Sequence, residues 1–301
     1  MNIGKITNQL HQPVLLEEVL TSLDIQPADQ VIDATIGFGG HAEEILKKLN
    51  SNGRLYGFDQ DYFAFNYVKE KFKDNKNVTL INKNFSYFQE IIKNQGTQNI
   101  TKVLLDLGMS SYHIDSSLRG FSYLKNEPLD MRMSLENTKL TAAIILNTYN
   151  NEKLESLFID YGEIRNPAQL INNIIEKRDT HKFETTNDLI AVIKKSFYFH
   201  NKRFLYIKTL SQVFQALRIE VNQELIVLTN FLDQLLTQLK PEARIAIITF
   251  HSLEARLVKN FYRKNNQLLK TINKKTIKPK QKEIMQNRRA KSAELRVFER
   301  I

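Results

Sequence analysis

The chain has 301 residues, of which 42% are hydrophobic and 25% charged, a composition typical of globular proteins with a sizeable core. It contains no cysteine, which excludes disulfide bonds, thiolate nucleophiles and cysteine-ligated zinc or iron–sulfur sites. The net charge is +10, and residues 254–301 carry 15 Lys and Arg against 4 Glu, so the positive excess lies in the C-terminal part.

Membrane insertion, export and metal binding are not indicated by the sequence. No apolar run approaches the roughly 18 residues that a membrane span needs. The N-terminus lacks a basic region followed by a cleavable apolar segment, so we expect a cytoplasmic protein without a membrane partner. Six histidines are scattered without metal-ligand spacing, and no metal is expected: His11, His41, His113, His181, His200 and His251.

The first third of the chain alternates short apolar runs with helical patterns, which is typical of a βαβ parallel sheet. Strands are predicted at residues 30–35, 53–61, 77–85 and 102–109, and helices at residues 41–49, 62–72 and 88–94. This alternation predicts half of a doubly wound α/β sheet.

The pattern changes after Met109. Residues 110–133 resemble a loop, and the convincing segments from residue 140 to residue 228 have helical period. A strand at 243–250, a helix at 252–264 and a strand at 293–299 follow, with a lysine-rich, linker-like stretch at 265–291. We therefore predict a discontinuous sheet domain, residues 1–115 and 216–301, interrupted by a helical insertion, residues 116–215.

A glycine turn follows the first predicted strand. Gly37, Gly39 and Ala42 fit the pattern G-x-G-x-x-A, and Asp59 lies about 20 residues further on, at the end of the next strand. An acidic residue at that point accepts hydrogen bonds from ribose hydroxyls. Both NAD and S-adenosylmethionine (SAM) are bound by such turns, so the glycines do not choose between them.

Three carboxylates help to decide whether NAD or SAM is the cofactor. Asp33, Asp59 and Asp106 are predicted at the carboxyl ends of strands, where open α/β sheets bind ligands. A negatively biased rim of this kind repels a pyrophosphate and favours the cationic SAM. The alternative for Asp33 is that it caps the turn through its own backbone.

Nine sequence blocks, in this order, resemble one known family, the MraW/RsmH bacterial 16S rRNA cytosine-N4 methyltransferases. The blocks are HQPVLLEEVL, GFGGH, FDQD, LLDLGMSS, RGFSY, PLDMRM, FQALRIEVNQEL, FHSLEARLVKNF and NRRAKSAELRVFER. The resemblance implies a Rossmann-like class I SAM-dependent methyltransferase domain of α/β class with an inserted all-helical domain. It also implies 16S rRNA of the small ribosomal subunit as the partner.

The resemblance further implies a SAM site made of Gly39, Gly40, His41, Asp59, Phe85, Asp106 and His113. His113 stands where the family usually has glutamine in SSPQLD, and Tyr112 replaces the proline of that motif. Phe38 replaces an arginine that is common inside the family's glycine turn.

Some of these residues also have simpler interpretations. His41 is equally well explained as a surface histidine in a first helical turn, and Phe85 as a core residue at a strand end. His251 either faces the active edge of the sheet or only shapes the turn. In the second case Ser252 is a plain helix N-cap, because Ala255 cannot complete a capping box.

Methylation of a cytosine amine requires a hydrogen-bond acceptor for its N–H, because the lone pair of that nitrogen is delocalised into the ring. Asp106 is the first candidate for the catalytic group, and the pair Asp130 and Arg132 is the second. An Asp-x-Arg pair is as often a salt bridge that fixes a loop.

RNA contacts are expected from the basic C-terminal segment and from KKSFYFHNKRF, residues 194–204, which interleaves cations with aromatic rings. The alternatives are a solvated tail and a helix end with a core aromatic stripe. An NAD-dependent oxidoreductase and a non-catalytic RNA-binding protein are the other functions considered. The sequence does not decide between a monomer and a homodimer.

Overall fold

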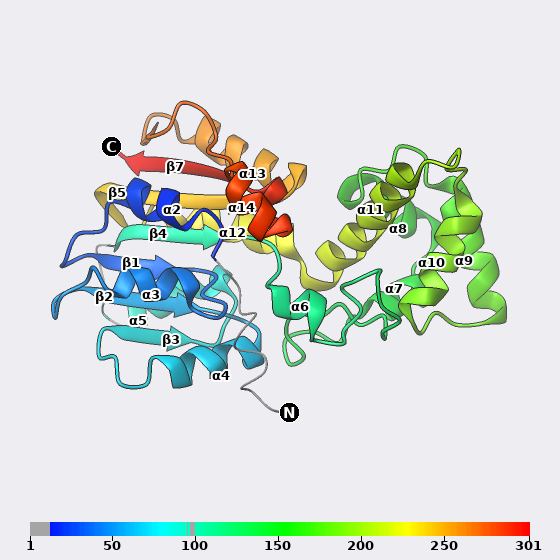
Figure 1. Cartoon of the computed structure of the whole chain (residues 1–301), viewed down its shortest axis with the longest axis horizontal. Helices are drawn as coiled ribbons and strands as arrows, with labels where there is room; N and C mark the ends of the chain where they lie inside the picture. Colours follow the sequence, from blue (N-terminus) through cyan, green and yellow to red (C-terminus); the bar gives the residue numbers. More distant parts are fainter. Residues whose placement is uncertain (1–12, 95, 97–99) are drawn as a thin grey trace. The chain divides into compact units, whose positions relative to one another are not determined.

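The computed structural model describes residues 13–94, 96 and 100–301 (Figure 1). His11, at the start of the block HQPVLLEEVL, lies outside the described residues. The chain divides into two compact units, one made of Met1–Gly108 with Leu225–Ile301 and the other of Met109–Glu224. The helical unit thus begins seven residues before, and ends nine residues after, the insertion bounds of 116 and 215 expected from sequence.

The first unit contains a seven-stranded sheet of order β3-β2-β1-β4-β5-β7-β6. Strands β1 to β5 pair in parallel, and β7 is antiparallel to both β5 and β6. This arrangement confirms the predicted Rossmann-like α/β fold. The strands are β1 Gln30–Asp33, β2 Arg54–Phe58, β3 Val78–Ile81, β4 Ile100–Asp106, β5 Leu239–Thr249, β6 Leu269–Thr271 and β7 Glu294–Arg300.

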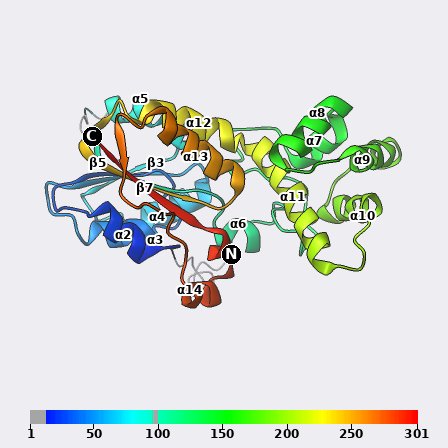
Figure 2. The same cartoon turned by 90° about the horizontal axis from the view of Figure 1, so that it is seen from above.

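Helices cover both faces of this sheet (Figure 2). Adjacent residues of one strand enter opposite cores, because side chains alternate along a strand. Val31 belongs to the core under α2 and α3, and Ile32 to the core under α5, α12 and α13. The helices of this unit are α2 Leu16–Leu23, α3 Gly40–Leu46, α4 Tyr62–Lys71, α5 Phe88–Asn94, α12 Glu224–Leu235, α13 Ser252–Lys264 and α14 Gln281–Gln286.

The second unit is built of helices around one apolar core. The helices are α6 Ser111–Asp115, α7 Ala142–Thr148, α8 Asn151–Ser156, a π-helical turn Leu157–Tyr161, α9 Ala168–Thr180, α10 Thr186–Ser196 and α11 Arg203–Asn222. In the described part of the chain, no helix combines the length and the hydropathy that a membrane crossing requires.

Two local predictions were wrong, and a third lacked a helix break. The loop expected over 110–133 contains α6, which begins where the Ser110 hydroxyl accepts a hydrogen bond from the His113 amide. The helical pattern predicted up to residue 228 is confirmed, with α11 and α12 separated at Gln223, whose φ is 51°. The expected linker 265–291 contains β6, α14 and a short 3-10 helix, and β6 depends on pairing with β7, which local sequence does not reveal.

Candidate active site

The glycine turn adopts the conformation that its sequence predicts. Gly37 and Gly39 have φ values of 51° and 74°, and α3 begins directly afterwards at Gly40. A Cβ on Gly39 would lie 2.8 Å from the Phe72 ring, and one on Gly40 would lie 3.1 Å from Pro13. The turn therefore needs glycine both for its backbone angles and for its close packing.

Gly39→Ala is expected to lower the free energy of unfolding by about 2 kcal/mol and to weaken SAM binding, because it combines left-handed strain with a clash. Gly96→Ala is the matched control, since Gly96 also has a positive φ but an added Cβ there would have nothing within 4 Å. Chemical denaturation and calorimetric titration measure the two effects. Equal costs for the two substitutions would contradict a role for close packing at Gly39.

Asp59 connects the end of β2 to this turn. Its Oδ2 accepts a hydrogen bond of 3.0 Å from the Gly37 amide, and its Oδ1 accepts one of 2.8 Å from the Asp61 amide. Asp61 is in turn the N-cap of α4. Asp59 is thus held by two backbone donors at the carboxyl edge of the sheet, where a ribose-binding carboxylate is expected.

Asp33 and Asp106 end the neighbouring strands β1 and β4. Asp33 is buried, and the Asp106 side chain is 13% exposed. Asp33 Oδ1 accepts a hydrogen bond of 3.2 Å from the Thr35 amide, so the turn-capping role considered for it is present. Burial raises the pKa of Asp33 to about 7, with a smaller contribution from the charge of Asp59. Burial also raises the pKa of Asp106 well above its ordinary value, and the charges of Asp33 and Glu254 raise it further.

Because these pKa values are raised, the carboxyls at the predicted negatively biased rim ionise less readily than ordinary aspartates. Carboxyls whose ionisation is disfavoured by burial and by neighbouring carboxylates are stabilised as anions by a cation placed beside them. Among the described residues, Asp106 Oδ1 is buried without a hydrogen-bond partner. The ammonium and sulfonium groups of SAM suit this site, whereas a pyrophosphate would add further negative charge.

His41 is buried, so its interpretation as a surface histidine is wrong. Its Nε2 lies 3.1 Å from the Val14 carbonyl oxygen, and its Nδ1 lies 3.8 Å from Asp106 Oδ2. When Nε2 donates to Val14, the neutral ring presents its unprotonated Nδ1 to Asp106. His41, in the first turn of α3, therefore lies beside the carboxyl group of Asp106.

Two phenylalanines of the sheet unit pack against other aromatic rings. Phe38 is buried and contacts Phe63 and Tyr67 edge-on, at centroid distances of 6.2 and 5.2 Å. The charge of the family's arginine is thus replaced by an aromatic cluster with α4. Phe85 is half-buried with its ring 5.3 Å from that of Phe231, which agrees with its core interpretation. Its contact with adenine stays a prediction.

His113 belongs to the helical unit. It is buried in α6, its Nδ1 lies 3.0 Å from the Ser110 hydroxyl, and its ring lies 5.2 Å from that of Phe121. These contacts fix the ring within its own unit. Its expected contact with the cofactor stays a prediction.

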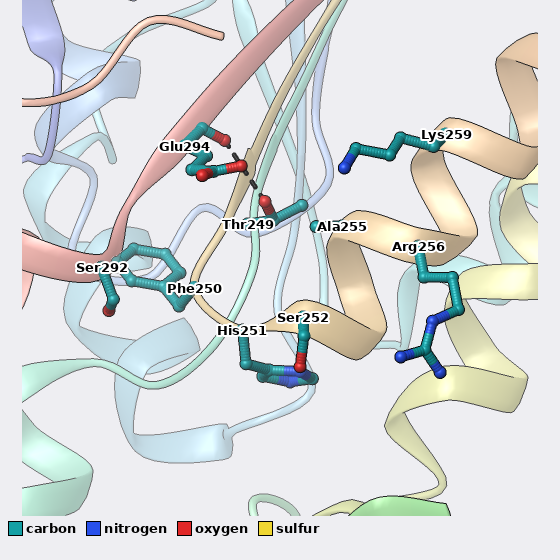
Figure 3. A pocket seen from close by; sticks show the side chains of 9 residues that line it. All are labelled: Thr249, Phe250, His251, Ser252, Ala255, Arg256, Lys259, Ser292 and Glu294. Carbon is teal, nitrogen blue, oxygen red and sulfur yellow. Dashed lines mark hydrogen bonds between the residues drawn. The ribbon is translucent and has the colours of Figure 1, made fainter. Parts of the chain in front are cut away.

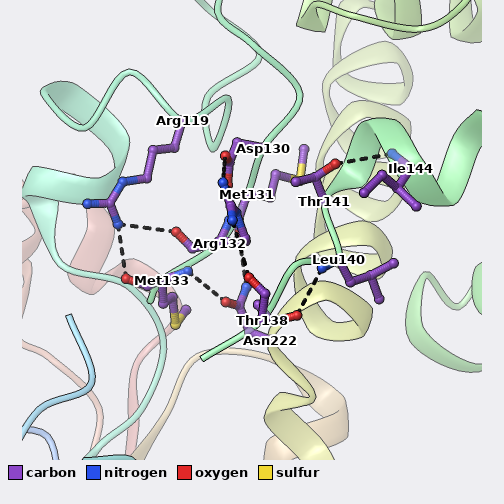
Figure 4. A network of polar contacts seen from close by, with 10 residues as sticks. All are labelled: Arg119, Asp130, Met131, Arg132, Met133, Thr138, Leu140, Thr141, Ile144 and Asn222. Carbon is purple, nitrogen blue, oxygen red and sulfur yellow. Dashed lines mark hydrogen bonds and ion pairs between the residues drawn. The ribbon is translucent and has the colours of Figure 1, made fainter. Parts of the chain in front are cut away.

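Asp130 and Arg132 form a two-pronged ion pair (Figure 4). The Arg132 Nε and Nη2 atoms donate to the two Asp130 oxygens at 2.8 and 2.7 Å, and Nη1 donates to the Thr138 carbonyl at 3.2 Å. Asn222 binds the backbone on either side of Arg132, at Met131 and Met133. These contacts are those of a salt bridge that fixes a loop, and the catalytic role of the pair stays a prediction.

The N-cap of α13 differs from the one predicted. His251, not Ser252, is the N-cap, and it forms a capping box with Glu254. The Glu254 Oε2 accepts hydrogen bonds from the amides of Phe250 and His251 at 2.7 and 3.3 Å. The predicted bounds of 252–264 match α13, but the N-cap was misplaced by one residue because histidine is not among the usual N-cap residues. Glu254, whose charge also raises the pKa of Asp106, was therefore not predicted as part of the site.

Known proteins resemble this chain over nearly its whole length. The model of the MraW methylase family matches residues 8–301. The ribosomal RNA small subunit methyltransferase H of Dictyoglomus turgidum is 44% identical over 97% of this chain and 97% of that relative. The proteins of the same name from Mycoplasmopsis pulmonis and Flavobacterium johnsoniae are 42% and 41% identical. They align with 97% and 98% of this chain and with 100% and 99% of their own lengths.

Proposed function

The chain belongs to the MraW methylase family, and on this premise we propose that it methylates the N4 amine of a cytidine in 16S rRNA of the small ribosomal subunit. It is a SAM-dependent methyltransferase of Rossmann-like fold. The observation that carries the proposal is the pair of largely buried carboxyls, Asp33 and Asp106, beside the glycine turn, because that pair favours a cationic ligand.

Different residues of the sheet unit bind different parts of the cofactor. The turn at Gly37 and Gly39 lets the backbone approach the ligand, and Asp59 accepts hydrogen bonds from the ribose hydroxyls. Asp33 and Asp106 attract the positive charges of the methionine portion. When bound, SAM supplies an electrophilic methyl group, which needs no metal for its transfer.

Asp106 is the proposed acceptor for the amine. Its Oδ1 is buried and lacks a hydrogen-bond partner among the described residues, so it can accept an N–H of the cytosine amino group. That hydrogen bond orients the amine and stabilises the positive charge that nitrogen acquires on methylation. Asp106 then serves as the first acceptor of the released proton.

The helical unit is the proposed RNA-substrate domain. In residues 194–204 two aromatic side chains point to solvent, Tyr198 at 81% and Phe204 at 73% exposure. They lie among Lys194, Lys195, Lys202 and Arg203. Phe197 and Phe199 instead pack against the core, so this segment combines the two interpretations given from sequence. Exposed rings beside cations suit base stacking and phosphate contact.

The double substitution Tyr198→Ala and Phe204→Ala is expected to weaken binding of 16S rRNA about tenfold or more, because stacking on one base contributes roughly 1–3 kcal/mol. SAM affinity should not change. Leu124→Ala is the matched control, because Leu124 is an 80% exposed apolar side chain in the same unit. Filter binding at fixed salt measures the effect, and an unchanged affinity of the double variant would argue for a merely structural segment.

Transfer of labelled methyl from SAM to isolated small ribosomal subunits tests the proposed function. The expected result is incorporation into 16S rRNA. Binding of the RNA without incorporation would favour a non-catalytic RNA-binding protein. Thermal stabilisation by NAD, but not by S-adenosylhomocysteine, would favour the oxidoreductase considered from sequence.

A further inference from the structure

A pocket of about 480 Å³ lies at the carboxyl edge of the sheet, beside the end of β5, the start of α13 and the start of β7 (Figure 3). The residues that line it include Phe250, His251, Arg256, Lys259, Ser292 and Glu294. The cofactor residues follow β1, β2 and β4, and β5 lies on the far side of β4 from them. A molecule in this pocket would therefore approach the Asp106 edge from the side opposite the glycine turn.

The pocket is close to Asp106 along the sheet. Asp106 pairs in register with Ile248, and the pocket lining begins at the next residue, Thr249. Glu254, which contributes to the raised pKa of Asp106, belongs to the same helix start as His251. The pocket is thus placed where a methyl acceptor would reach the proposed acceptor oxygen.

His251 presents a buried donor at this pocket. Its side chain is 10% exposed, and its Nδ1 accepts the capping hydrogen bond from the Glu254 amide at 3.4 Å. Because Nδ1 acts as the acceptor, the neutral ring carries its proton on Nε2. Nε2 is buried without a hydrogen-bond partner among the described residues, although Glu254 Oε1 lies 3.1 Å away outside hydrogen-bond geometry. Such a donor suits an acceptor atom of a ligand.

The rest of the lining combines cations with an apolar ring. Arg256 and Lys259 are three residues apart on α13 and project from the same stretch of that helix. Within the described residues, Lys259 makes no ion pair. The one carboxylate of the lining, Glu294, is already held by Lys278 at 3.1 Å and Arg296 at 2.8 Å. The ring of Phe250 adds an apolar surface, so the pocket suits a ligand with a planar base and a phosphate.

We propose that this pocket receives the nucleotide that is methylated. His251 Nε2 donates to an acceptor on the ring edge of the base, and Arg256 and Lys259 bind the adjacent phosphates. The inference rests on the proposed function, because it takes an RNA nucleotide as the methyl acceptor. It adds a binding site for that nucleotide and names His251 as the residue that orients it.

Two substitutions with controls test the pocket by steady-state methyl transfer to small ribosomal subunits. His251→Asn keeps a side-chain oxygen for the N-cap but removes the Nε2 donor. We expect His251→Asn to lower kcat/KM about tenfold or more with little change in melting temperature. His251→Ala should lower both kcat/KM and the melting temperature. Lys259→Gln should raise KM for the subunits about threefold or more and reduce the salt slope of binding by about one. Lys73→Gln, at an exposed position near the end of α4, is the charge-matched control.

The outcomes separate the two proposals. If the wild type methylates the subunits and His251→Asn and Lys259→Gln match it, the pocket is not the acceptor site and the proposed function stands. If His251→Asn weakens SAM binding as much as it lowers kcat/KM, the pocket belongs to the cofactor site and the inference is wrong. If the wild type transfers no methyl group, both the proposed function and the inference fail.

Discussion

Asp59→Ala is expected to weaken SAM binding by about two orders of magnitude, as measured by calorimetric titration. The carboxylate that accepts hydrogen bonds from the ribose is lost, and hydrogen bonds to charged groups contribute roughly 1.5–3 kcal/mol each. The substitution also frees the Gly37 amide, which Asp59 Oδ2 holds at 3.0 Å, so the turn loses part of its support. Both effects act on the cofactor.

Binding of 16S rRNA by Asp59→Ala should stay close to that of the wild type, with the same salt dependence. Asp59→Asn provides the matched comparison, because its amide oxygen can still accept from one backbone donor while the charge is removed. Its SAM affinity should lie between those of the wild type and the alanine variant. Loss of RNA and SAM binding together would point to misfolding and would remove the support for Asp59 as a cofactor residue.

Asp33→Asn is expected to have opposite effects on stability and on cofactor binding. Burial raises the folded-state pKa of Asp33 from 3.8 to about 7, so the folded protein holds this proton more tightly than the unfolded chain. The contribution to stability is therefore fully present below about pH 4 and is lost as the pH rises through 7. At pH 8 the loss is about 4 kcal/mol, and asparagine should recover a large part of it.

The same titration makes SAM binding depend on pH. A cationic ligand favours the ionised carboxylate, so a proton on Asp33 competes with SAM. With a pKa of about 7, this group alone should weaken SAM binding about tenfold at pH 6 relative to pH 8. Asp33→Asn should bind SAM more weakly at pH 8 and should show less of this pH dependence.

Thermal unfolding of the cofactor-free protein and SAM titration at both pH values measure these effects. Asp24→Asn is a suitable control, because Asp24 lies at an exposed position at the end of α2. A variant Asp33→Asn that is less stable than the wild type at pH 8, or that retains the full pH dependence of SAM binding, would contradict the role given to this carboxyl.

The placement of the proposed cofactor residues could be predicted because they follow strands that the sequence marks clearly. Asp33, Asp59 and Asp106 each come after an apolar run, and parallel strands bring their carboxyl ends to one edge. The glycine turn was predictable for a similar reason, since a turn between a strand and a helix with positive φ values requires glycine. These features depend on residues near one another in the chain.

Other parts of the site depend on distant contacts. The raised pKa of Asp106 involves Glu254, which is almost 150 residues away in the sequence. The capping box of His251 and Glu254 escaped prediction because the usual N-cap residue, serine, is adjacent. The π-helical turn after α8 and the pairing of β6 with β7 likewise follow from tertiary packing, which overrides local propensity.

Identification of the methylated nucleoside tests the central claim most directly. Small ribosomal subunits that lack the modification would be treated with the protein and SAM, and the 16S rRNA digested and analysed by mass spectrometry against nucleoside standards. We predict a cytidine that carries one new methyl group on N4, at a single position of the RNA. A new methyl group on a carbon of the base, on the ribose or on another nucleoside would contradict this prediction, as would the absence of any new methylated nucleoside.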